Sequence, residues 1–93
     1  MVNEKRKAEL LRQLSTLQAE LDELARTDKD QAKTIAGFAE LSAHEATRPK
    51  PRPELLTLSV TGLRKSVQEF EETHPRLVEI VGSLSALLSN IGV

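Results

Sequence analysis

The sequence contains no cysteine, tryptophan or tyrosine, and Phe38 and Phe70 are its only phenylalanines. Without cysteine, the chain cannot form disulfide bonds, iron–sulfur clusters or thiolate zinc sites, and it has no thiol for catalysis. With so few aromatic rings, base-stacking platforms and aromatic cages for cations are also excluded. The apolar content of 39% is almost entirely aliphatic, so any core must be aliphatic too.

An excess of one charge sign is also missing, because 13 lysines and arginines face 14 acidic residues for a net charge of −1. This balance argues against strong nonspecific attraction to nucleic acid or to anionic lipid. No apolar run of signal-peptide length follows the charged start at Glu4. We therefore expect a cytoplasmic protein without a membrane anchor, folded as one domain over residues 1–93.

The first part of the chain carries leucines at alternating spacings of four and three, which predicts a helix from Glu4 to about Ala25. Asn3 is expected to cap its start. This spacing is typical of the apolar seam of a coiled coil. The seam residues are Leu10, Leu14, Leu17, Leu21 and Leu24.

A second helix is predicted from Asp28 or Asp30 to Ala46, because an aspartate near the positive end of a helix is favourable. Its apolar stripe is weaker than that of the first helix and includes Ile35, Phe38, Ala39 and Leu41. Alternating prolines then follow in residues 48–53, and a hydrogen-bonded helix cannot continue through them.

A third helix is predicted from Glu54 to about Glu72, with an apolar seam at Leu56, Val60, Leu63, Val67 and Phe70. Pro75 is expected to open a last helix that runs to about Ile91, with Thr73 or His74 as its cap and Gly92 in its terminating turn. This last helix has almost no charge, so we expect it at the centre of a bundle. Its large apolar residues include Leu77, Val81, Leu84, Leu88 and Ile91.

These elements predict an all-α protein with a helical hairpin in residues 1–47, a proline-rich spacer in 48–53 and a second hairpin in 54–93. One chain could close into a four-helix bundle. The narrow seams and the broad apolar face of the last helix instead favour an oligomeric helical bundle, most simply a homodimer in which the last helices meet. We therefore identify the seam residues of the first and last helices as candidate contacts with a second copy or a partner.

The spacer contains three cations, Arg48, Lys50 and Arg52, which could contact nucleic acid. In a polyproline II helix they would point in three different directions, which disfavours a phosphate-tracking role. Recognition by a proline-reading domain requires prolines three residues apart, whereas these lie two apart. A semi-rigid connection between the two hairpins is the simplest interpretation.

Catalytic and metal-binding patterns are missing from the sequence. His44 and His74 have no partner at a metal-binding spacing, and we expect a solvent-facing side chain and a helix cap, respectively. Serines occur without a nucleophile motif, and the four glycines are isolated, so no phosphate-binding loop exists. We expect no enzyme activity, no cofactor and no metal.

A family resemblance is carried by the ending VQEFEETHPRLVEIVGSLSALLSNIGV, in particular by Phe70, Glu71, His74, Pro75 and Leu77 and by the closing Asn90, Ile91 and Gly92. This segment resembles the C-terminal part of a family of short bacterial proteins catalogued only as a domain of unknown function. The opening KAELLRQLSTLQAEL is similar to the leucine-rich first helix of that family. The resemblance implies a small helical bacterial protein and no particular chemistry.

Two classes of function remain. The first is a self-associating interaction or scaffold module that offers a helical face to another protein. The alternative is a nucleic-acid or nucleoid accessory protein, in which an oligomer repeats the basic spacer. Only the second predicts binding to nucleic acid that weakens steeply with salt.

Overall fold

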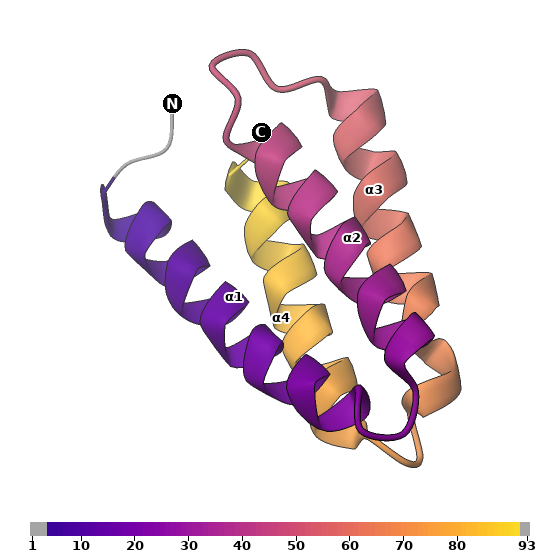
Figure 1. The fold of residues 1–93 in the computed structure, drawn as a ribbon. Coiled ribbons are helices and arrows are strands. Elements are labelled where there is room, and N and C mark those ends of the chain that lie inside the picture. Colours follow the sequence, from indigo (N-terminus) through magenta and orange to yellow (C-terminus); the bar gives the residue numbers. More distant parts are fainter. Residues whose placement is uncertain (1–3, 92–93) are drawn as a thin grey trace.

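Residues 4–91 of the protein are described by a computed structural model, in which they form four α-helices and one short 3-10 helix (Figure 1). The elements are α1 (Glu4–Leu24), α2 (Lys29–Ala46), α3 (Pro53–Ser66), the 3-10 helix η1 (Gln68–Phe70) and α4 (Pro75–Ile91). Residues 4–91 contain no strand. The predicted all-α fold class is therefore confirmed.

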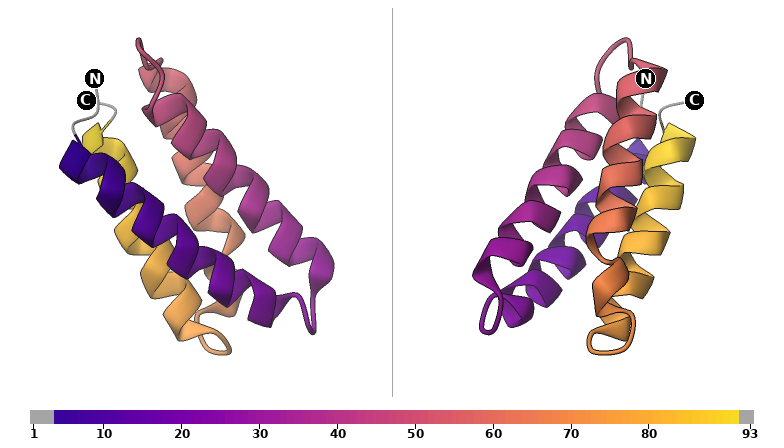
Figure 2. Two further views of the ribbon diagram at one scale, coloured as in Figure 1. Left: turned by 60° about the vertical axis from the view of Figure 1, so that its left-hand side comes forward. Right: turned by 90° about the vertical axis from the view of Figure 1, so that its right-hand side faces the viewer.

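The four α-helices alternate in direction along the chain and form two layers, α1 with α4 and α2 with α3 (Figure 2). The contacts within these two pairs are more extensive than those between α1 and α2. α4 contacts each of the other α-helices, and so does α2, so α4 is not distinguished as the central helix of the bundle. The described parts of the two predicted hairpins thus pack on each other within one chain.

Local sequence explains most of the helix boundaries. The Asp28 side chain accepts a hydrogen bond of 3.1 Å from the backbone N–H of Gln31 and so caps α2. Proline occupies the first position of α3 and of α4, where its missing N–H would have no partner in any case. The predicted cap Asn3 and the predicted terminating residue Gly92 lie outside the described residues.

The predicted third helix is too long, because α3 ends at Ser66 and not near Glu72. The backbone N–H of Val67 donates to the carbonyl of Arg64 at 3.4 Å, and the N–H of Phe70 donates to the carbonyl of Val67 at 2.9 Å. This tighter i to i+3 bonding replaces the α-helical pattern. Val67 and Phe70 remain buried all the same, since the 3-10 turn keeps both side chains on the core side.

The core is one cluster of aliphatic side chains with a single buried phenylalanine, to which all four α-helices contribute. It contains every member of the third predicted seam. Leu41 departs from expectation, because it was predicted within the apolar stripe of the second helix but is 60% exposed. Within residues 4–91, no helix combines the length and the hydropathy needed to cross a membrane.

Candidate interaction surface

The structure places the predicted contact seams in the core of a single chain. Leu14 is half-buried, and the other members of the set are buried: Leu10, Leu17, Leu21, Leu24, Leu77, Val81, Leu84, Leu88 and Ile91. The seams of α1 and α4 face each other, because these two helices lie side by side. The premise that these seams need a second chain to cover them is therefore wrong, whereas self-association itself stays a prediction.

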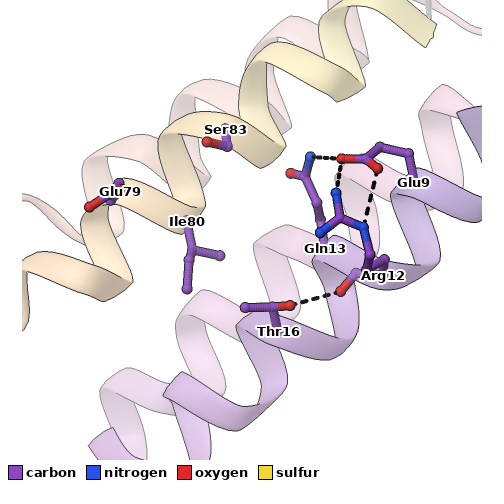
Figure 3. Close-up of a pocket in the computed structure, with 7 residues that line it drawn as sticks. All are labelled: Glu9, Arg12, Gln13, Thr16, Glu79, Ile80 and Ser83. Carbon is purple, nitrogen blue, oxygen red and sulfur yellow. Dashed lines mark hydrogen bonds and ion pairs between the residues drawn. The ribbon is translucent and has the colours of Figure 1, made fainter.

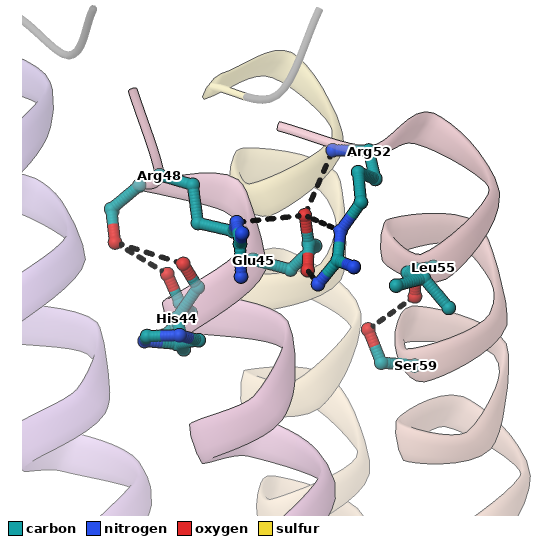
Figure 4. A network of polar contacts seen from close by, with 8 residues as sticks. His44, Glu45, Arg48, Arg52, Leu55 and Ser59 are labelled. Atoms are coloured by element: carbon teal, nitrogen blue, oxygen red, sulfur yellow. Dashed lines mark hydrogen bonds and ion pairs between the residues drawn. The ribbon is translucent and has the colours of Figure 1, made fainter. Parts of the chain in front are cut away.

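Residues 48–52 of the predicted spacer fold into a compact loop whose arginines reach back to α2, and Pro53 already belongs to α3 (Figure 4). The backbone N–H of Arg52 donates to Glu45 Oε2 at 2.8 Å, and its guanidinium Nη2 donates to Oε1 at 3.0 Å. Arg48 Nε lies 3.6 Å from Glu45 Oε2. Two of the three spacer cations are thus paired within the protein, and Lys50 is exposed.

Glu45 organises this loop from a nearly buried position, since its side chain is 7% exposed. Hydrogen bonds from the Arg52 side chain, followed by the bond from the Arg52 backbone, lower the pKa of the Glu45 carboxyl. Glu45 was not among the predicted site residues, because the segment that contains Pro49 and Pro51 separates it from Arg52, and the two therefore share no helix whose spacing could pair them. A glutamate one turn before a cluster of arginines was the only available signal.

Exposed apolar side chains gather around the end of α2 that leads into this loop. The large apolar residues most exposed to solvent among residues 4–91 are Leu11, Leu41, Leu55 and Leu58. Leu41, Leu55 and Leu58 line a groove of about 400 Å³ between α2 and α3, and the half-buried ring of Phe38 lines it as well. Glu45 and its two arginines border this α2–α3 groove.

Leu11 lines a second groove, of about 630 Å³, between α1 and α2. Leu10, Leu14, Ala43 and Pro49 supply most of the other apolar surface of this α1–α2 groove. Its charged or titratable lining residues are Lys7, His44 and Arg48, so no carboxylate lines it. His44 and Arg48 belong to both grooves, which therefore adjoin along the end of α2.

A third groove, between α1 and α4, is polar and holds about 300 Å³ (Figure 3). Glu9 accepts hydrogen bonds there from Arg12 and Gln13, and the bond from Arg12 contributes most to a lowered pKa of the Glu9 carboxyl. A carboxylate held in its ionised form by an arginine is a poor proton donor at neutral pH. Glu79 and Ser83 on α4 face this groove without a histidine beside them.

Neither histidine forms part of a catalytic or metal-binding arrangement. His44 is exposed, as predicted. His74 precedes α4, where its carbonyl accepts the N–H of Val78 at 3.3 Å and its ring packs edge-on against Phe70 at a centroid distance of 5.6 Å. Within the part of the chain that the structure describes, no group of three metal-binding side chains converges.

Comparison with known proteins identifies a family. No curated protein and no solved structure matches this chain. Residues 10–93 match the family described as Domain of unknown function (DUF4404). This match spans α2, α3 and α4 and most of α1, and it includes the ending and, from Leu10 onward, the leucine-rich opening on which the resemblance was based. The chain therefore belongs to the DUF4404 family of domains of unknown function.

Proposed function

We propose that this protein is a non-enzymatic interaction module of the cytoplasm, and that it associates with itself through the α2–α3 groove. One observation carries the proposal: the most exposed large apolar side chains all line one of two adjoining grooves. Single exposed leucines are ordinary on a protein surface, whereas a contiguous apolar patch is typical of a contact site.

The charges around the α2–α3 groove favour a second copy as the occupant. Glu45 lies between Arg48 and Arg52, so the border of this groove is largely compensated and does not repel an identical surface. In a two-fold dimer each copy presents the same patch to the other. Leu58, which is 68% exposed, would then insert beside Leu41 and Leu55 of the other copy.

Sedimentation of the wild-type chain over a wide range of concentrations tests self-association. We expect a dimer, and we expect Leu58→Glu to remain a monomer because the substitution places a charge in the apolar contact. Leu11→Glu is the matched control, since Leu11 is similarly exposed but lies in the other groove. A wild-type monomer at every concentration would contradict the proposal.

The same experiment separates this dimer from one in which the α4 helices meet. Ala86 is exposed on α4, so Ala86→Glu would disrupt an α4 contact and leave the α2–α3 contact intact. We expect Ala86→Glu to sediment as a dimer. Dissociation of Ala86→Glu, with Leu58→Glu still dimeric, would move the interface to α4.

A further inference from the structure

The α1–α2 groove differs from its neighbour in its charge. Lys7 and Arg48 line it together with His44, and no carboxylate lies among its lining residues. Its apolar surface comes from Leu10, Leu11 and other small or aliphatic side chains. Arg48 is partly compensated by Glu45, which lies outside this groove, so Lys7 carries most of the uncompensated charge of the groove. An identical groove facing it would add a second such cation, so a second copy is a poor occupant.

We propose that the α1–α2 groove binds an acidic amphipathic helix of a partner protein. The inference rests on the proposed interaction function but uses the groove that self-association leaves open. The apolar face of the partner helix would cover Leu11 and Leu14, and acidic residues beside that face would lie opposite Lys7 and Arg48. This is the helix-in-groove mode of recognition combined with charge complementarity.

The dimensions of the groove suit such an occupant. Lys7, Leu11 and Leu14 lie on successive turns of α1, and the seven positions between the first and the last rise by about 10 Å. Two turns of a partner helix cover that length. α1 and α2 diverge towards this end of the bundle (Figure 1), so an added helix can lie against both.

Glu45 links the groove to the arginine pairs of the loop. Its one carboxylate is shared by Arg48 and Arg52, at 3.6 Å and 3.0 Å. Arg48 can therefore accept a second anion at little expense to its existing pair. Removing the Glu45 charge would leave Arg48 fully available to the partner, and the affinity for an acidic helix should rise.

The probe is a fluorescently labelled synthetic helical peptide of roughly 15 residues that carries a leucine stripe flanked by glutamates. Its binding to the full chain is measured by fluorescence anisotropy. We expect Leu11→Ala to weaken binding about tenfold and Lys7→Gln about threefold. Glu45→Gln should tighten it by about the same threefold factor. Lys5→Gln and Leu58→Ala are controls, because Lys5 and Leu58 are exposed and lie outside this groove.

Two outcomes would overturn the inference. A peptide with lysines in place of the glutamates could bind equally well, which would remove the charge complementarity. Alternatively, Leu58→Ala could weaken binding while Leu11→Ala does not, which would assign the peptide to the α2–α3 groove.

Binding by the Leu58→Glu variant keeps the two proposals separate. If it binds the acidic peptide as a monomer, both proposals stand. If the wild-type chain never dimerises but still binds the peptide at Leu11, only self-association fails. If a DNA oligonucleotide binds in place of the peptide and responds to Lys50→Gln, the groove inference fails in favour of the basic loop.

Discussion

Gly62 shows how a single residue sets the spacing between two helices. A Cβ atom added to Gly62 would overlap the ring of Phe38, whereas a Cβ at Gly37 or Gly82 would meet nothing within 4 Å. The absence of a side chain at Gly62 therefore lets α3 approach the face of α2 that carries Phe38. At Gly37 and Gly82, both exposed within helices, the glycine only lowers helix propensity.

Alanine substitutions at two of these glycines should have opposite effects on stability. We expect Gly82→Ala to raise the free energy of unfolding by about 0.5–1 kcal/mol, because alanine favours the helix. Gly62→Ala should lower it by about 1–3 kcal/mol, because the Phe38 ring must move. Urea unfolding measures both changes, and the penalty at Gly62 should shrink in a Phe38→Leu background. Equal stabilisation by both substitutions would show that the close approach is unimportant.

Glu45 should make stability depend on pH in the acid range. Its folded pKa is lowered, chiefly by the Arg52 side chain, so its contribution is fully present above the unfolded value of about 4.3. This contribution is lost as the pH falls through the folded pKa. Glu45→Gln should thus be less stable than wild type at about pH 7, and this difference in the free energy of unfolding should become smaller at about pH 3.

The exposed Glu40 on the same helix supplies the control for this titration. Glu40→Gln should follow the wild-type pH dependence in urea unfolding. The pKa of Glu9 is also lowered, chiefly by Arg12, so part of the dependence of stability on acid pH should remain in every variant. If Glu45→Gln lost as much free energy of unfolding between the two pH values as the wild type does, Glu45 would not anchor the loop.

At the scale of the element, α4 is the most apolar helix, and like α2 it contacts each of the other α-helices. Its leucines Leu77, Leu84 and Leu88 are fully buried. Arg6 of α1 donates to the backbone carbonyl of Asn90 at 3.2 Å, which places a cation at the negative end of α4. At the other end, Arg76 lies 3.5 Å from Glu20 of α1. α1 and α4 are thus paired along their whole length.

Leu84→Ala tests whether the α4 seam belongs to the core. Leu84 has no exposed surface, so its truncation should lower the free energy of unfolding by about 2–5 kcal/mol. Leu58→Ala, at a position that is 68% exposed, should change it by less than about 0.5 kcal/mol. Chemical denaturation at low protein concentration, where the proposed dimer would dissociate, measures both changes. A small effect at Leu84 would mean that the seam is not packed within the chain.

At the scale of the whole molecule, one chain buries its own apolar seams, so folding should not require a partner. We expect the monomeric Leu58→Glu variant to unfold in a single cooperative transition with a midpoint independent of protein concentration. If the wild-type chain dimerises as proposed, its midpoint should rise with concentration, because association would stabilise only the folded chain. A concentration-dependent midpoint for Leu58→Glu would show that the fold itself depends on association.

The sequence alone determined the helices and most members of the core. The period of the leucines, the aspartates at the start of α2 and Pro75 are local signals, and they predicted the four α-helices and most of their ends correctly. Pro53, which was predicted within the spacer, opens α3. The five residues of the third predicted seam are all buried, although its last two lie beyond the end of α3. The spacing of apolar residues identified the side chains that face the core, even where the α-helix ends before the seam does.

Only the tertiary structure decided what those inward faces meet. Packing of α1 on α4 covers within one chain the seams that had suggested a second copy. It also leaves Leu11, Leu41, Leu55 and Leu58 outside, and it brings Arg52 back to Glu45. These outcomes depend on which helices become neighbours, and periodicity along a single chain carries no information about that pairing.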